Sequence, residues 1–305
     1  MAATDIIKEQ RKEIVERVIA DMEKGGAQWI MPWSQHFAQR NAVSGHVYRG
    51  GNRIHLAFVS MMRGFDDPRW CTFNQAKSMG WNVKKGAKSA AIEHWKTFTS
   101  VSENADGDTV ITRFPKLVGY WRVFNACEIE GIPALPELKL READASGAGE
   151  IADALIASSR CPIREEMAIN QACYLPFADR IEMPHRLTFD GDESFARTLL
   201  HEMAHSTGHA SALDRNMGSR FGSEGYAMEE LVAELGSMFA AADLGLGGTQ
   251  PDPRHHEQHV AYLQSWLKAL REDESALFAA ASKADDAATF ILSRMEGAEA
   301  LDAAA

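Results

Sequence analysis

The chain has 305 residues, of which 45% are hydrophobic and 25% are charged, a composition typical of folded globular proteins. This length exceeds the usual size of one domain, so we expect two. The four cysteines form no C-x-x-C pair, which argues against a disulfide scaffold and against a cysteine-based zinc ribbon. The N-terminus has no apolar core of a signal peptide, and no uncharged apolar stretch reaches membrane-spanning length. We therefore expect a cytoplasmic protein without membrane contact.

The net charge of −11 is distributed unevenly along the chain. Residues 1–141 hold 20 basic and 15 acidic residues, a net charge of +5, whereas residues 142–305 hold 12 and 28, a net charge of −16. Within 24–100 there are 11 basic and 3 acidic residues, a net charge of +8. Such asymmetry indicates a part that binds a polyanion, joined to a part with another role.

The hydrophobic pattern predicts a mixture of helices and short strands. In the N-terminal half we expect a helix at 5–24, a helical segment at 52–63, strands at 90–98 and 109–114 joined by a turn at 103–108, and a further strand at 116–124. In the C-terminal half we expect helices at 150–158, 192–207 and 226–243, at least one more within 254–280, and short strands near 172–183.

A segment rich in proline, alanine and glycine at 132–149 indicates a linker. We place a first domain at 1–135, the linker at 136–149 and a second domain at 150–305. The predicted fold class is α+β, with an N-terminal α+β domain and a mainly helical C-terminal domain.

The most specific motif is His201-Glu202-Met203-Ala204-His205, which matches H-E-x-x-H. Residues four apart lie on one face of a helix, so both imidazoles can reach one metal ion. Glu202 can hold a water beside that ion and act as the general base of a peptidase. We therefore predict a metal-dependent hydrolase site with Glu202 as the catalytic residue.

A catalytic zinc site takes three protein ligands, and the third is expected from the helix predicted at 226–243. Glu230 is the preferred ligand, with Glu234 behind it hydrogen-bonded to a ligand histidine. Glu229 is the alternative ligand. Zn²⁺ is the default metal for two histidines and a carboxylate, and Mn²⁺ also suits this set.

Tryptophans and phenylalanines alternate with arginines and lysines in the basic segment. Cations that follow a backbone, together with rings on which bases stack, are typical of a surface for single-stranded nucleic acid. Core packing of these rings is the competing interpretation. The candidate DNA-binding residues are Arg40, Tyr48, Arg49, Trp81, Lys84, Lys85 and Lys88.

Several motifs resemble those of ArdC-type antirestriction proteins. In the N-terminal half they are Tyr48–Asn52, Trp70–Ala76, Gly80–Gly86 and Val123–Asn125. In the C-terminal half they are His201–His209, Leu213–Arg215 and Glu229–Leu235, which resemble the zincin-like metallopeptidase domain of that family.

The resemblance covers nearly the whole chain and implies a function. It implies an N-terminal domain that binds single-stranded DNA, a C-terminal zincin-like peptidase domain, and protection of incoming conjugative plasmid DNA from host restriction. The family's metal ligands correspond to His201, His205 and one glutamate of the Glu229-Glu230 pair, and its general base corresponds to Glu202. A DNA-bound host protein is a candidate peptidase substrate. The alternative is a purely single-stranded-DNA-binding protein whose metal site is structural or inactive.

Overall fold

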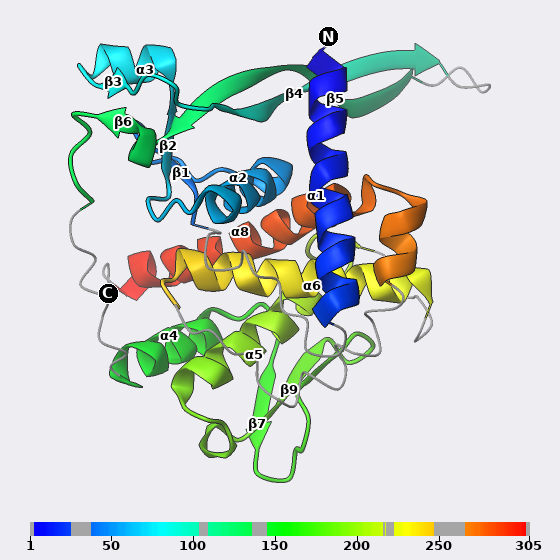
Figure 1. The fold of residues 1–305 in the computed structure, drawn as a ribbon. Helices are drawn as coiled ribbons and strands as arrows, with labels where there is room; N and C mark the ends of the chain where they lie inside the picture. Colours follow the sequence, from blue (N-terminus) through cyan, green and yellow to red (C-terminus); the bar gives the residue numbers. More distant parts are fainter. Residues whose placement is uncertain are drawn as a thin grey trace.

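The structure is a computed structural model that describes residues 3–25, 38–103, 109–135, 145–215, 217, 223–246 and 266–302. Figure 1 shows a layer of strands above a stack of helices, with a second small sheet below. Among the described residues, none of the helices combines the length and low polarity that spanning a bilayer requires.

The N-terminal half begins with the expected amphipathic helix and continues into a sheet. Its helices are α1 (Ala3–Gly25), α2 (Gly50–Arg63) and α3 (Phe73–Ser78). Its strands are β1 (Arg40–Asn41), β2 (Arg69–Thr72), β3 (Asn82–Val83), β4 (Ala90–Glu103), β5 (Thr109–Asn125) and β6 (Ile129–Glu130), with a short 3-10 turn η3 (Ala126–Glu128) before the last. Strands β1, β2, β5 and β4 form one sheet in this order, and β3 pairs with β6.

The predicted hairpin at 90–114 is confirmed and is longer than expected. The strands expected at 109–114 and 116–124 are one strand, β5, which continues through Pro115. Beyond the short pairing of β5 with β2 at Val123–Asn125, β4 is the partner of β5 in the sheet. Among the described strands, only β4 lies beside β5 at Pro115, so the other side of β5 is an edge there, and proline within a sheet is tolerated on such edge strands.

The C-terminal half is mainly helical, as expected. Its helices are α4 (Ala145–Ser158), α5 (Asp192–Ser206), α6 (Glu224–Asp243) and α8 (Ala276–Asp302), with a further helical stretch at 266–272. A three-stranded sheet has the order β7 (Ile163–Glu166), β9 (Arg180–Pro184) and β8 (Cys173–Leu175), and a 3-10 turn η4 (Arg186–Thr188) leads into α5.

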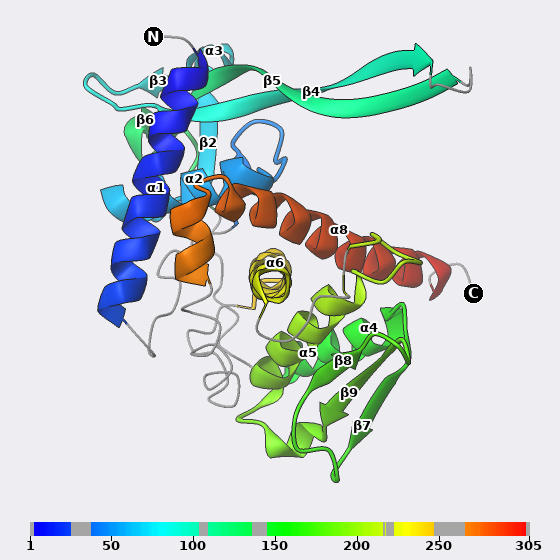
Figure 2. The same ribbon diagram turned by 90° about the vertical axis from the view of Figure 1, so that its right-hand side faces the viewer.

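Helix α6 lies at the centre of the helical stack. Figure 2 looks along its axis, with α8 crossing on one side and α5 on the other. Gly236 allows this close approach, because a Cβ there would lie 3.3 Å from the Ala284 carbonyl oxygen and 3.4 Å from the Ala204 Cβ. Small residues on this helix therefore bring α5 and α6 into the contact that the metal motif requires.

The two halves share one hydrophobic core. Ile14 and Val18 of α1 and Ile54 and Phe58 of α2 are at most 4% exposed, and they belong to the same buried cluster as the apolar residues of α5, α6 and α8. A smaller cluster lies between α2 and the sheet and includes the fully buried Trp70. The predicted linker begins outside the described residues at 136–144, and its last residues, from Ala145 onward, are the first turn of α4.

Candidate metal centre

The H-E-x-x-H motif lies in the last turns of α5, on the side that packs against α6. The rings of His201 and His205 meet edge to face, with their centroids 4.8 Å apart. Both side chains are 12% exposed, and Glu202 between them is buried at 5% exposure. The carboxylates of Asp192 and Glu193 in the first turn of α5 interact favourably with the positive end of the helix dipole, and Gly191 occupies the N-cap position.

Glu230 of α6 lies between the two imidazoles. Its Oε2 is 3.7 Å from Nε2 of His201, and its Oε1 is 3.6 Å from Nε2 of His205. One ligand atom from each of these three residues lies within 4.8 Å of the other two, an arrangement compatible with a shared metal ion. No other group of three or more histidine, cysteine or acidic side chains in the described part of the chain has this spacing.

The neighbouring glutamates face the opposite nitrogens of the same rings. Oε2 of Glu234 lies 3.4 Å from Nδ1 of His201, and Oε1 of Glu229 lies 3.7 Å from Nδ1 of His205. Such carboxylates fix the orientation of a metal-bound imidazole and raise its basicity. The geometry therefore separates Glu230, which faces both Nε2 atoms, from Glu229 and Glu234, which support one histidine each.

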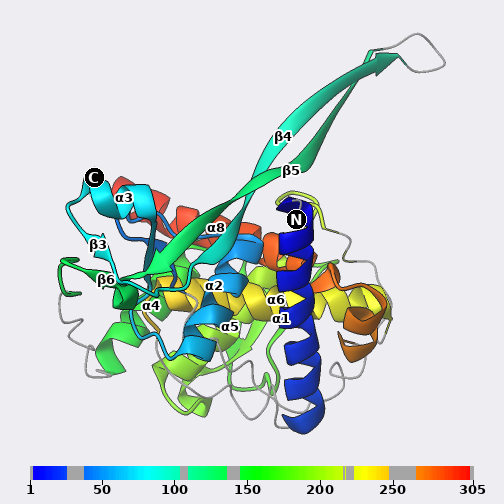
Figure 3. The ribbon, with the colours of Figure 1, turned by 45° about the horizontal axis from the view of Figure 1, so that its top comes forward.

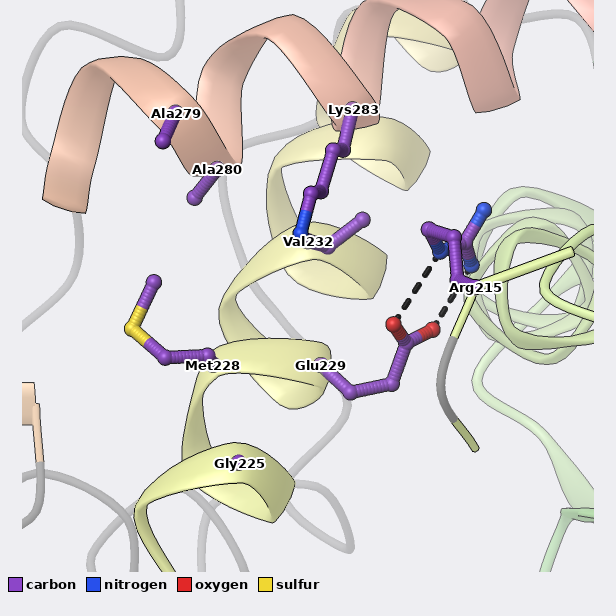
Figure 4. Close-up of a pocket in the computed structure, with 8 residues that line it drawn as sticks. All are labelled: Arg215, Gly225, Met228, Glu229, Val232, Ala279, Ala280 and Lys283. Carbon is purple, nitrogen blue, oxygen red and sulfur yellow. Dashed lines mark hydrogen bonds and ion pairs between the residues drawn. The ribbon is translucent and has the colours of Figure 1, made fainter. Parts of the chain in front are cut away.

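Arg215 holds Glu229 in place. Its Nε and Nη2 donate to the Glu229 carboxylate at 3.0 and 2.6 Å, as Figure 4 shows. The same guanidinium donates to Oγ1 of Thr207 and to the carbonyl oxygen of Ala204, both at 2.8 Å. Arg215 thus ties the end of α5 to α6. Sequence reasoning assigned this arginine no site role, although it belongs to a motif that carries the family resemblance.

The electrostatics of the cluster favour a cation. Burial alone lowers the pKa of His205, but the nearby carboxylates of Glu229 and Glu230 outweigh it and raise the pKa to about 9. The pKa of His201 is raised well above its ordinary value in the same way, by Glu230 and Glu234 acting against burial. Burial raises the pKa of Glu230, but the two histidines outweigh it and lower the pKa far below the ordinary range. Three carboxylates around two imidazoles therefore leave an excess of negative charge that suits a divalent ion.

Glu202 lies within electrostatic reach of both His201 and the small sheet, and its charge contributes to the raised pKa of His201. Burial raises the pKa of the Cys173 thiol, and the charge of Glu202 raises it further, which places the carboxylate near the start of β8. Strand β8 is an edge of its sheet, whereas β9 is central. An extended chain pairing with β8 would therefore lie beside Glu202.

The candidate DNA-binding residues are scattered through the N-terminal half. Tyr48 is only 9% exposed and belongs to the cluster beneath the sheet, so burial there disfavours its predicted role in stacking on a base. Arg49 precedes α2 and lies 3.6 Å from Asp285 of α8. Trp81 is partly buried against the cluster that contains Ile129.

The remaining basic candidates lie at the surface. Arg40 is exposed on β1, and Lys84, Lys85 and Lys88 are exposed in the segment after β3. Nζ of Lys84 donates to the carbonyl oxygen of Cys127 at 2.8 Å, while the Lys88 carbonyl accepts from Arg63. The described residues do not bring all seven candidates onto one surface.

Two family models match the chain in succession. Residues 8–124 match the N-terminal domain of the anti-restriction factor ArdC, and residues 150–283 match a zincin-like metallopeptidase. The metal-free crystal structure of the antirestriction protein ArdC from plasmid R388 is 30% identical, has a TM-score of 0.69, and the match covers 94% of this chain and 98% of that one. The chain belongs to the ArdC antirestriction family.

Other relatives extend this family assignment. The Mn(II)-bound structure of the R388 protein is 31% identical, with a TM-score of 0.68 and coverage of 93% and 97%. The uncharacterized protein y4eC of Sinorhizobium fredii (strain NBRC 101917 / NGR234) is 32% identical over 94% of this chain and 93% of its own length. A DNA primase TraC of Escherichia coli is 37% identical over 94% of this chain, which spans only 27% of TraC.

Proposed function

We propose that this chain is a metal-dependent peptidase which its own N-terminal half delivers to single-stranded DNA. The observation that carries the proposal is the convergence of His201, His205 and Glu230 beside the buried Glu202. In this proposal the three residues hold Zn²⁺, with Mn²⁺ as the competing metal, and Glu202 is the general base. Glu229 and Glu234 orient the two histidines, and Arg215 positions Glu229.

The chemistry divides between the metal and the chain. When bound, a divalent ion supplies Lewis acidity that activates water and polarises the scissile carbonyl. The Glu202 carboxylate accepts the proton of the attacking water and returns it to the nitrogen of the leaving amine. The edge strand β8 holds the peptide extended next to Glu202 through main-chain hydrogen bonds.

In this proposal, the N-terminal half determines where the peptidase acts. Its excess of basic residues, +8 within 24–100, and its membership in the ArdC family support binding to single-stranded DNA. The biological role that follows is protection of incoming conjugative DNA from restriction in the recipient cytoplasm. A host protein bound to that DNA is the proposed peptidase substrate.

Substitution of the general base tests the peptidase separately from the metal. Glu202→Gln should retain about one equivalent of metal by elemental analysis, yet lose protection in a conjugation assay with a restricting recipient. Glu193→Gln, an identical chemical change in the first turn of the same helix, is the matched control and should behave as wild type. His201→Ala should lose both metal and protection.

Two outcomes contradict the proposal in different ways. Full protection by Glu202→Gln with metal bound would favour a DNA-binding protein whose metal site is structural. Wild-type protein that binds neither Zn²⁺ nor Mn²⁺ in a titration would refute the metal site itself.

A further inference from the structure

The β4–β5 hairpin continues far beyond the body of the protein as a two-stranded arm. Figure 3 shows it projecting away from both layers. We define the arm as residues 95–102 and 109–118, beyond the register shift at His94/Trp95. Every residue from 95 to 102 and from 109 to 116 is exposed, so both faces of the ribbon meet solvent. At about 3.3 Å per residue, its strands extend roughly 25–30 Å.

The arm presents large apolar side chains that nothing in the described structure covers. Phe98 is 40% exposed, Phe114 is 42% exposed and Ile111 is 62% exposed. An isolated two-stranded ribbon is marginally stable in water, and exposed apolar patches usually mark interaction sites. The exposed rings therefore indicate that the arm contacts a partner.

One face of the arm carries paired rings next to paired lysines. Phe98 and Phe114 are direct cross-strand partners whose rings stack with centroids 6.3 Å apart. Two residues along, and therefore on the same face, Lys96 and Lys116 are also direct partners. Nζ of Lys116 lies 5.8 Å from the Phe98 ring centroid. Like charges directly opposite each other destabilise a ribbon, and an anion bound across the pair would relieve this repulsion.

The charge of the arm identifies that anion's class. The stretches 94–102 and 109–122 contain the basic residues Lys96, Arg113, Lys116 and Arg122 and no acidic residue, whereas the acidic residues Glu103, Asp106 and Asp108 follow one another in the sequence between them, away from the Lys96–Lys116 pair. Glu93, at the base of the hairpin, is already bound by Arg11 through a 2.7 Å ion pair. A second copy of this chain, with its net charge of −11, would offer carboxylates, but it would not explain stacked rings beside the cations. Alternating phosphates and flat bases match both features.

We infer that the β4–β5 arm is a binding surface for single-stranded nucleic acid, with Lys96 and Lys116 on the backbone phosphates and the Phe98–Phe114 pair as a stacking platform for bases. This inference rests on the proposed single-strand binding of the N-terminal half and adds the surface that performs it. The arm lies apart from the exposed lysines at 84–88, which the sequence favoured.

The test measures binding of a fluorescein-labelled 20-residue thymidine oligonucleotide to the full chain by fluorescence anisotropy. Phe98→Ala/Phe114→Ala should weaken binding by about 5-fold to 150-fold, the range found when one base-stacking ring is lost. Lys96→Ala/Lys116→Ala should reduce the slope of log K against log salt by about 1.4, since each phosphate contact on a single strand contributes about 0.7.

Matched variants elsewhere control for these changes. Phe177→Ala/Leu187→Ala removes two side chains that are 108% and 81% exposed in the C-terminal half. Lys12→Ala/Lys268→Ala removes two lysines from exposed i,i+4 ion pairs on helices. Both should bind as wild type. All the arm side chains concerned are exposed, so the thermal midpoint of every variant should match that of wild type.

The outcomes separate this inference from the proposed function. If wild type binds the oligonucleotide and the arm variants bind equally well with the same salt slope, the arm inference is overturned and the proposed function stands. If wild type shows no salt-dependent binding, both fail. Arm variants that change the sedimenting mass but leave affinity unchanged would assign the arm to self-association and overturn the inference.

Discussion

Arg53 of α2 is the clearest test of how the two halves are joined. It is 1% exposed, and its Nη1 and Nη2 donate to the Asp243 carboxylate of α6 at 3.1 and 2.7 Å. Nη2 also donates to the Phe239 carbonyl at 3.1 Å, and the guanidinium lies 4.5 Å from the Phe239 ring centroid. Asp285 of α8, 5% exposed, approaches Nη1 at 3.5 Å. One N-terminal arginine therefore contacts two carboxylates of the C-terminal half.

Arg53→Met should cost about 3–5 kcal/mol of unfolding free energy, because it leaves the partly exposed Asp243 carboxylate without its cation and the buried Asp285 carboxylate with only Arg49 nearby. The assay is equilibrium urea denaturation, followed by tryptophan fluorescence and circular dichroism to verify a single transition. The triple variant Arg53→Met/Asp243→Asn/Asp285→Asn should lose less than Arg53→Met alone, since the uncompensated charges are gone.

The pH dependence of the stability lost in Arg53→Met gives an independent check of the role of Arg53. Burial raises the pKa of Asp285, and Arg53 and Arg49 oppose this rise. Without Arg53 the pKa rises further, so the ionised carboxylate destabilises the folded state above that pKa and protonation relieves the penalty as pH falls. The deficit of Arg53→Met should therefore be smaller at pH 5 than at pH 8. A loss below 1 kcal/mol at both pH values, or a larger deficit at pH 5, would refute this reasoning.

Three further perturbations have defined outcomes. Arg215→Met frees the Glu229 carboxylate and should weaken metal binding by about 10-fold to 100-fold in a chelator competition, and unchanged affinity would contradict its positioning role. Burial lowers the pKa of His55 to about 4, so the neutral ring contributes stability above pH 6.5 that is lost as pH falls toward 4. The loss is about 3 kcal/mol, and His55→Leu should remove this part of the pH dependence of urea unfolding; an identical pH profile would count against it. Gly236→Leu introduces a side chain at a position where even a Cβ would lie 3.3 Å from the Ala284 carbonyl oxygen. It should separate α5 from α6 and reduce both the melting temperature and the metal stoichiometry. Retention of both would be inconsistent with the packing described.

The parts of the molecule that follow local rules were predictable from the sequence. The shared helix face of His201 and His205 follows from their i,i+4 spacing, and the β4–β5 hairpin follows from two apolar runs that flank a turn. The choice between Glu229 and Glu230 could not follow from spacing, because successive residues on a helix point about 100° apart and only packing fixes the rotation. In the structure, α6 is rotated so that the Glu230 carboxylate faces Nε2 of both histidines, which favours Glu230 as the third ligand.

Contacts between distant segments escaped the sequence analysis. Tyr48 belongs to an aromatic and basic segment, so composition could not distinguish a ring that packs beneath a sheet from one that binds a base. Arg49, assigned to DNA, faces Asp285 from a position 236 residues away in the chain. The alanine-rich helix α8, for which the sequence pattern predicted no element, is packed into the main core, since its small side chains permit close helix crossings.

The common core has a practical consequence for dissecting this family. Cutting the chain near residue 136 would expose the apolar faces of α1 and α2 on one fragment and the helices that cover them on the other. Fragments prepared this way would tend to aggregate, so neither DNA affinity nor metal content measured on them would describe the intact molecule.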